Sequence, residues 1–128
     1  EVQGQRALND LRSSMGVLPY ETHPALVTAI DGHLKWCGAN EWSHFGPPGS
    51  RSPQERTEKA GYAGSTSENL VTGGGFVGAV TTWRWDGGHF RNMLIPNYTH
   101  VGVGIGPGAG FNNGFGPGGS RGAPTCAA

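Results

Sequence analysis

Residues 68–106 read ENLVTGGGFVGAVTTWRWDGGHFRNMLIPNYTHVGVGIG, and this stretch decides how the fold is interpreted. Four apolar residues at helical spacing predict a helix that begins near residue 76: Phe76, Val77, Val80 and Trp83. That helix breaks at Asp86-Gly87-Gly88, and the residues from His89 to Leu94 suffice for one further helical turn before Pro96. Thr99–Ile105 alternates small and β-branched residues, which predicts a strand whose glycines pack closely against another backbone.

Three further helices are predicted upstream of this stretch. The first spans residues 5–16 and carries apolar residues at helical spacing, namely Ala7, Leu8, Leu11 and Met15. The second begins near His23-Pro24, with proline in the first turn, and ends at Gly38-Ala39-Asn40. The third has Ser52 as its N-cap, followed by Pro53 and then by Glu55 three residues after the cap, and it stops at Gly61.

The segments that join and follow these helices are rich in chain-breaking residues. The loop between the second and third helices carries His44 beside Gly46-Pro47-Pro48. Residues 107–128 contain so much glycine and proline that they predict a C-terminal loop or tail, with Phe111 and Phe115 as possible anchors. We therefore expect one domain over residues 1–128, with 107–128 as its Gly/Pro-rich C-terminal segment.

Composition argues against nucleic-acid binding and against a membrane-spanning helix. The chain has 128 residues, and its Lys+Arg count of 9 equals its Asp+Glu count of 9, which argues against binding of nucleic acid because phosphate contacts need a basic face. No apolar run approaches the roughly 20 residues that a membrane-spanning helix needs. The two cysteines, Cys37 and Cys126, either form one bridge or remain unpaired thiols, and two cysteines alone do not decide between these states.

Four side chains that can carry chemistry lie next to chain-breaking residues: His44, Glu68, Asp86 and His89. Imidazoles are ordinary ligands of zinc, so His44 and His89 are the predicted ligands of a divalent metal ion. Water would fill the remaining positions, and we expect weak binding. Glu68 and Asp86 would orient the histidines or hold a water molecule, and they are the candidate catalytic bases if the chain is an enzyme.

The same residues also have simpler interpretations. A histidine in a loop is more often exposed to solvent than bound to a metal. Asp86 precedes His89 by three residues, and it could simply cap the helical turn there. His33 on the second helix is interpreted as structural, and His23 and His100 are interpreted as surface groups.

Two segments, ERTEKAGYAGSTSENL at 55–70 and AVTTWRWDGGHFRNMLIPNYTHVGVGIG at 79–106, resemble the CAP superfamily. This superfamily comprises cysteine-rich secretory proteins, antigen 5 and plant pathogenesis-related proteins, with many secreted bacterial (SCP-like) members. The resemblance extends over about residues 5–106. ALNDLRSSMGVLPYETHPAL resembles the first helix and connector of the family, AIDGHLKW its second helix, and WSHFGPPGS the loop that carries its first histidine.

The resemblance implies an α+β fold, an α-β-α sandwich with a central antiparallel sheet between helical layers. It also implies a central cleft with two histidines and two acids, matched here by His44, Glu68, Asp86 and His89. The position of Asp86 is usually a glutamate in the family. Because aspartate is one methylene shorter, its contact with a histidine or a bound water depends on the local geometry.

Three functions follow as expectations. The resemblance implies a secreted binding domain whose His/acid cleft holds a divalent metal ion, zinc before others, together with a small or apolar ligand or a protein partner. A metal-dependent or acid/base hydrolase that uses the same four residues is the alternative, although no Ser/His/Asp or HExxH motif supports it. An interaction module of a longer extracellular protein is the third. We expect an extracellular or cell-envelope location, reached after removal of a signal peptide that this chain does not contain.

Overall fold

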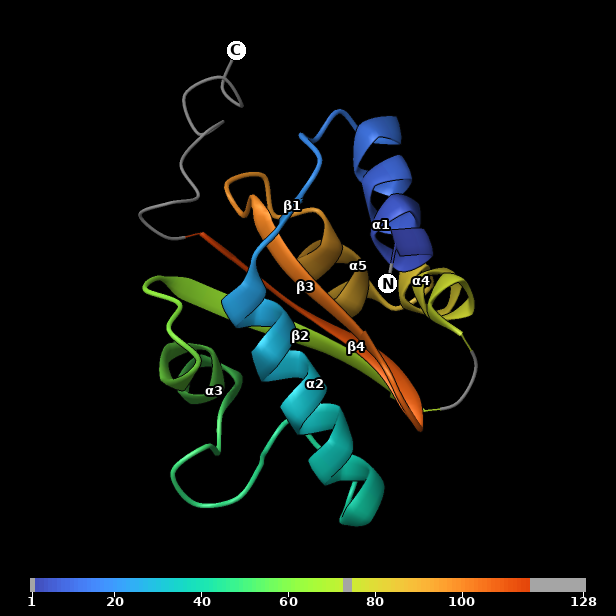
Figure 1. Cartoon of the computed structure of the whole chain (residues 1–128). Helices are drawn as coiled ribbons and strands as arrows, with labels where there is room; N and C mark the ends of the chain where they lie inside the picture. The colour runs from blue at the N-terminus through green and yellow to red at the C-terminus, as the bar shows by residue number, and fades with distance from the viewer. Residues whose placement is uncertain (1, 73–74, 116–128) are drawn as a thin grey trace.

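A four-stranded sheet forms the middle layer of the protein (Figure 1). The computed structural model describes residues 2–72 and 75–115, and within them the strands lie in the order β1-β3-β4-β2. Their bounds are β1 Glu21–Thr22, β2 Ser65–Thr72, β3 His100–Ile105 and β4 Gly108–Phe115. The pairs β2–β4 and β3–β4 are antiparallel, as predicted, but β1 pairs in parallel with the start of β3. The sheet is therefore mixed, because the connector between the first two helices runs alongside β3 in the same direction.

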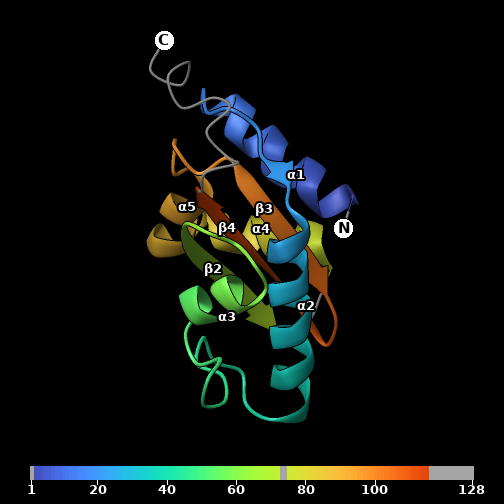
Figure 2. The same cartoon turned by 60° about the vertical axis from the view of Figure 1, so that its left-hand side comes forward.

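Helices cover both faces of the sheet (Figure 2). One face carries α2 (Pro24–Ala39) and α3 (Pro53–Lys59), and the other carries α1 (Val2–Ser14), α4 (Phe76–Arg84) and α5 (Gly87–Met93). This arrangement confirms the predicted α+β sandwich. None of the helices within the described residues is long and apolar enough to cross a membrane.

The local signals that predicted the helix starts are confirmed. Ser52 forms a complete capping box with Glu55 at the start of α3. His23 caps α2, where its Nδ1 accepts a hydrogen bond from the amide of Ala25 at 3.1 Å. Met15, predicted on the apolar face of the first helix, lies past the end of α1 and is 47% exposed.

The larger core cluster lies between the sheet and the layer of α1, α4 and α5. Trp83 of α4 is 1% exposed, and its ring meets the ring of Phe111 edge-on at 5.3 Å. Its indole Nε1 donates to the carbonyl oxygen of Leu70 in β2 at 3.1 Å, so the buried polar atom is satisfied. Trp83, one of the apolar residues that predicted this helix, therefore lies in the core.

Strand β4 shows that the tail interpretation of residues 107–128 was wrong for residues 108–115. These residues form an interior strand between β2 and β3, and all but the last are buried. The glycines of this strand leave no room for a side chain. At Gly108, for example, a Cβ would lie 2.3 Å from the ring of Trp42 and 2.3 Å from the carbonyl oxygen of Val71. Residues 116–128 lie outside the described residues.

Gly102 in β3 is expected to be indispensable because it lets α2 approach the sheet. A Cβ at this position would lie 2.2 Å from the backbone carbon of Leu26 and 2.2 Å from the backbone nitrogen of Val27, which cannot rotate away. We expect Gly102→Ala to lower the free energy of unfolding by about 3 kcal/mol or more, measured by urea denaturation. Gly106→Ala is the control, because its Cβ would meet only the Cβ of Leu34 at 3.9 Å. Equal losses in both variants would contradict the close approach.

Candidate functional site

The buried carboxylate of Glu68 is the centre of the first half of the site. Glu68 lies in β2 and is 7% exposed. The Nη2 of Arg56 donates to both of its oxygens, at 2.9 Å to Oε1 and 2.8 Å to Oε2. The side-chain amide of Asn112, its partner across the sheet, donates to Oε2 at 3.1 Å, and Nδ1 of His44 lies 3.0 Å from Oε1. Both oxygens are therefore occupied.

These partners keep Glu68 ionised. Burial alone would raise the pKa of this carboxyl group. The hydrogen bond from His44 and the charge and hydrogen bonds of Arg56 outweigh burial, and they hold the pKa of Glu68 below its ordinary value. His33 adds a smaller effect in the same direction, with its Nε2 4.0 Å from Oε1. A carboxylate in this state accepts hydrogen bonds and orients its neighbours.

Arg56 is the functional residue that sequence reasoning missed. It lies in α3 and is 7% exposed, whereas its neighbour Arg51 is exposed. Its second terminal nitrogen, Nη1, donates to the carbonyl oxygens of Ser50 and Arg51 at 3.2 and 2.9 Å. The only signal in the sequence was Glu68 itself, because an acid that becomes buried needs a cationic partner. The spacing of the sequence does not say which arginine is that partner.

His44 is held by its Nδ1 atom and is otherwise open to solvent. Its side chain is 46% exposed, although the Glu68 side chain that it contacts is fully buried. Because a carboxylate oxygen can only accept, the Nδ1 of His44 must carry the proton in this contact. The Nε2 atom of the neutral ring is then a lone-pair donor available to a ligand.

His33 has the structural role that was predicted for it. It is 2% exposed, and its Nε2 donates to the carbonyl oxygen of Ser43 at 2.6 Å, directly before His44. Burial holds the pKa of His33 below its ordinary value, so the ring is neutral at pH 7. The Sγ of Cys37 lies 3.3 Å from the same Nε2. His33 therefore fixes the start of the loop that carries the exposed histidine.

Asp86 and His89 form the second half of the site at the start of α5. Asp86 is the N-cap of this helix, and its Oδ1 accepts from the amide nitrogen of His89 at 3.2 Å. The same oxygen lies 3.2 Å from the Nδ1 of His89, whose side chain is 33% exposed. The hydrogen bond from the His89 amide, more than any other cause, holds the pKa of Asp86 below its ordinary value. The shorter acid thus caps the helix and orients the histidine.

A network of asparagines holds α5 against the sheet. The side-chain amide of Asn69 in β2 donates to the carbonyl oxygen of His89 at 3.1 Å. Asn92 of α5 donates to Oδ1 of Asn69 at 2.7 Å, and Asn113 of β4 donates to the carbonyl oxygen of Asn92 at 2.9 Å. The position of His89 is therefore tied to the strand that carries Glu68.

The two halves flank the same edge strand from opposite sides. Glu68 and Asn69 are consecutive in β2, so their side chains point to opposite faces of the sheet, and β2 is an edge strand. Within residues 2–72 and 75–115, no hydrogen bond or ion pair joins the His44–Glu68 pair to the Asp86–His89 pair. Nor does this part of the chain contain a group of three or more His, Cys, Asp or Glu side chains placed to hold a metal ion.

Two other sequence interpretations are changed or left open. His100, predicted at the surface, is 6% exposed, and its Nδ1 lies 3.0 Å from the hydroxyl of Tyr62, whose pKa is raised to about 12 by burial. The reason is that β3 is covered by α2. Cys37 is buried, and burial raises the pKa of its thiol. Cys126 lies outside the described residues, so its pairing with Cys37 stays a prediction.

Comparison with known proteins identifies the fold. The structure is similar to an extracellular protein containing an SCP domain from Bacillus anthracis, with 23% identity, a TM-score of 0.80, and coverage of 89% of this chain and 39% of that one. It is also similar to an outer surface protein of Borrelia burgdorferi (16% identity, TM-score 0.71, 85% of each chain). A cysteine-rich secretory protein of Staphylococcus aureus matches with 13% identity and a TM-score of 0.74, over 88% of this chain and 36% of that one.

The chain spans 39% of the Bacillus protein and 36% of the Staphylococcus protein, with which it shares the fold. No curated protein matches the chain. The model of the cysteine-rich secretory protein (CAP) family, however, matches residues 5–115. This range contains both His–acid pairs and every helix and strand of the structure except the first three residues of α1. The chain belongs to the CAP family of cysteine-rich secretory proteins.

Proposed function

We propose that the chain is an extracellular binding domain in which His44 and His89 present their Nε2 atoms to one divalent metal ion, with zinc as the expected occupant. The observation that carries the proposal is that a carboxylate holds the Nδ1 of each ring, at 3.0 Å for Glu68 and 3.2 Å for Asp86. Metal-binding histidines commonly have such an acceptor, which fixes the ring and its tautomer. Both rings are also partly open to solvent.

The charges around the pairs favour weak, exchangeable binding. Two imidazoles leave the remaining coordination positions to water. Arg56 pairs with Glu68, so this acid orients His44 but contributes little net attraction for a cation. A metal ion shared by both histidines would have to lie across the edge of β2, because the two pairs approach that strand from opposite faces.

The hydrolase alternative is less well supported by the same geometry. A general base needs a free lone pair and a pKa near the working pH. Both oxygens of Glu68 accept hydrogen bonds, and its partners hold its pKa low. Asp86 is occupied as a helix cap, and its pKa is also held low. These features suit acids that orient other groups better than acids that abstract a proton.

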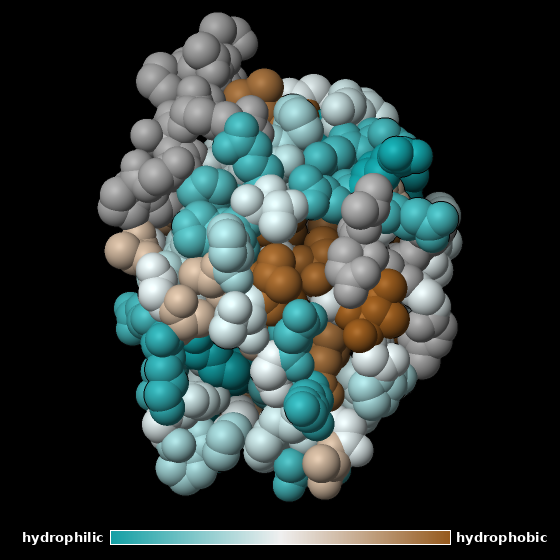
Figure 3. Space-filling model, in the orientation of Figure 1, coloured by the Kyte–Doolittle hydropathy of each residue, from teal (hydrophilic) through white to brown (hydrophobic). Residues whose placement is uncertain are grey.

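Exposed apolar surface supports the further part of the proposal, that the domain takes an apolar ligand or a protein partner. Phe45 is 59% exposed beside His44, and Trp85 is 85% exposed beside Asp86. Figure 3 shows brown, apolar surface gathered near the middle of the face in view, with teal, polar surface around it. Exposed apolar patches often mark binding surfaces. The extracellular location is proposed from the secreted and surface proteins that share the fold.

Zinc titration of the purified protein, followed by calorimetry, tests the proposed metal site. We expect His44→Ala and His89→Ala each to weaken binding about tenfold or more, and the double variant, which keeps neither ligand, to bind at least as weakly as the weaker single variant. Binding should also weaken as the pH falls, because an imidazole must lose its proton to bind. If both single variants bound zinc as tightly as the wild type, the shared site would be excluded.

Asp86→Asn separates the orienting role of this acid from its capping role. Asparagine caps helices as well as aspartate does, so the fold should be retained, as circular dichroism would check. The neutral amide no longer stabilises a protonated Nδ1 as a carboxylate does. We expect zinc affinity to fall about tenfold in this variant. Unchanged affinity would show that Asp86 serves the helix alone.

A further inference from the structure

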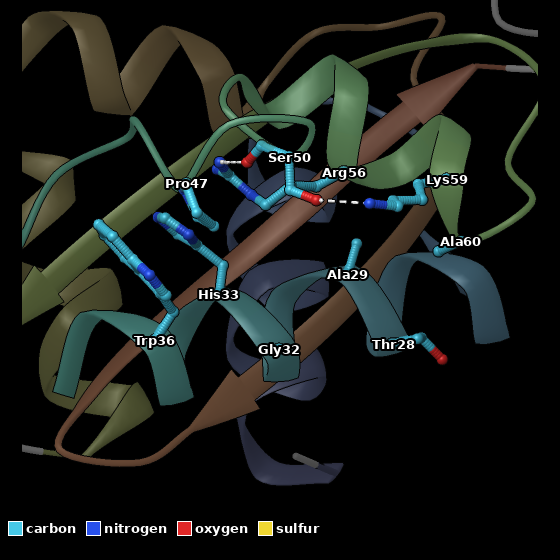
Figure 4. Close-up of a pocket in the computed structure, with 10 residues that line it drawn as sticks. All are labelled: Thr28, Ala29, Gly32, His33, Trp36, Pro47, Ser50, Arg56, Lys59 and Ala60. Carbon is cyan, nitrogen blue, oxygen red and sulfur yellow. Dashed lines mark hydrogen bonds between the residues drawn. The ribbon is translucent and has the colours of Figure 1, made fainter. Parts of the chain in front are cut away.

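An open pocket of about 340 Å³ lies between α2, α3 and the loop that precedes α3 (Figure 4). Its volume is within the range of pockets that hold small molecules. Neither His–acid pair lines it, although His33 and Arg56, which contact Glu68, form part of its wall. One end is formed by Trp36, His33 and Pro47 and the other by Lys59, and Ser50 and Arg56 lie between them.

The first end of the pocket offers a flat, uncharged surface. The rings of His33 and Trp36 are stacked, with centroids 6.0 Å apart and an interplanar angle of 12°. The His33 side chain is fully buried and neutral, so it lies behind the Trp36 ring and adds no charge. Between the two ends the wall is formed by small residues, among them Ala29 and Gly32. This surface suits a planar apolar group.

The second end carries one positive charge that is not compensated. The charge of Arg56 is neutralised by Glu68, with which it forms a buried ion pair. Lys59 is exposed, and its amine has a hydrogen bond of 3.3 Å to the hydroxyl of Ser50. In the part of the chain that the structure describes, no carboxylate forms an ion pair with Lys59. An anionic group at this end would therefore meet an available ammonium group.

We infer that this pocket binds a small molecule with a planar apolar body and one carboxylate, the body against the partly exposed Trp36 ring and the carboxylate on Lys59. This site does not depend on the proposed metal site, because its ligand would contact neither His44 nor His89. A failure of either proposal would therefore leave the other standing.

Titration of the metal-free full chain with phenylacetate, followed by NMR, tests the charge requirement. We expect shifts of the Trp36 indole signal, and binding about threefold tighter than that of the neutral analogue phenylacetamide. Lys59→Gln should remove that difference. Lys35→Gln is the matched control, because Lys35 is exposed on α2 and does not line the pocket. Equal binding of the acid and the amide by the wild type would overturn the assignment of the carboxylate.

A second variant tests the location without weakening the fold. A Cβ at Gly32 would meet nothing within 4 Å, so Gly32→Leu should fill the pocket and favour α2, since leucine is a better helix former than glycine. We expect phenylacetate binding to fall about tenfold or more, with thermal stability kept or raised. Gly78→Leu on α4 is the control, because a Cβ there also meets open space, away from the pocket. If Gly32→Leu were saturated at the same phenylacetate concentrations as the wild type, the proposed site would be wrong.

Discussion

Replacing Arg56 with methionine is expected to lower the free energy of unfolding by about 3–5 kcal/mol at pH 7, because it leaves a charged group buried without its partner. The two bonds from Arg56 Nη2 to Glu68 measure 2.9 and 2.8 Å, and the Glu68 side chain is fully buried. Methionine keeps much of the apolar stem of arginine, so the loss isolates the charge and its hydrogen bonds. Urea denaturation measures the effect.

Two controls and the pH dependence distinguish this cause from a general loss of packing. Arg51→Met, at an exposed neighbour, should change stability little. The double variant with Glu68→Met should recover most of the loss, because no buried charge remains.

The pH dependence has a definite sign. In the wild type the pKa of Glu68 is held low, so its contribution is present above the ordinary glutamate pKa and is lost as the pH falls through the folded-state value. In Arg56→Met the hydrogen bond from His44 remains, but the charge and hydrogen bonds of Arg56 no longer oppose burial. We therefore expect the pKa of Glu68 to rise, and protonation then relieves the buried charge. The deficit of the variant should therefore shrink between pH 7 and about pH 4. A deficit independent of pH would count against the explanation.

Arg12→Met is expected to have the other large effect, about 3 kcal/mol or more, because several backbone carbonyl oxygens would lose their donors. Arg12 is fully buried and lies 3.9 Å from the centre of the Tyr20 ring. Its guanidinium donates to the carbonyl oxygens of Leu18, Met93 and Tyr98 at 2.7, 2.8 and 2.8 Å. These bonds connect α1 to the connector that follows it, to the last residue of α5 and to the segment between α5 and β3.

The exposed Arg6 on the same helix provides the matched control for Arg12. Arg6→Met should leave the urea midpoint nearly unchanged. Because Met93 ends α5, the helix that carries His89, we also expect the amides of α5 to exchange hydrogen faster in Arg12→Met. Equal loss of stability in the two variants would mean that the carbonyl contacts of Arg12 carry no special weight.

The helices were predictable because their signals are local. Ser52 and Glu55 satisfy the amides at the start of α3, and Pro24 occupies the first turn of α2, so a few neighbouring residues specify each start. The strand over Thr99–Ile105 was predictable for the same reason, and the close approach that its glycines indicated is confirmed at Gly102.

The other three strands were not predicted. β1 has only two residues, and the residues of β2 and β4 are determined by partners distant in the sequence. In β4, Gly110 is required because a Cβ would lie 2.8 Å from the Leu70 side chain and 2.9 Å from the carbonyl oxygen of Asn69. Read alone, such glycines indicate a flexible tail. In β2 the polar residues Ser67 and Asn69 bond across the sheet and to α5, and they leave no alternating apolar pattern.

The candidate site was predicted as residues but not as contacts. His44 and Glu68 meet, and so do Asp86 and His89, each pair through Nδ1. The capping interpretation of Asp86 and its orienting role proved compatible, because one oxygen serves both. The contact between Arg56 and Glu68 could not be predicted, because the sequence of α3 does not indicate which residue of the sheet it packs against.

The tautomer of the two site histidines in the metal-free protein tests the central claim most directly. Long-range proton–nitrogen NMR spectra distinguish a ring protonated at Nδ1 from one protonated at Nε2. His33 is the internal reference, because its Nε2 donates to the carbonyl oxygen of Ser43 and must carry the proton. We predict that neutral His44 and His89 are both protonated at Nδ1, with Nε2 free for a ligand. Protonation at Nε2 in either ring would contradict the proposed carboxylate-oriented site.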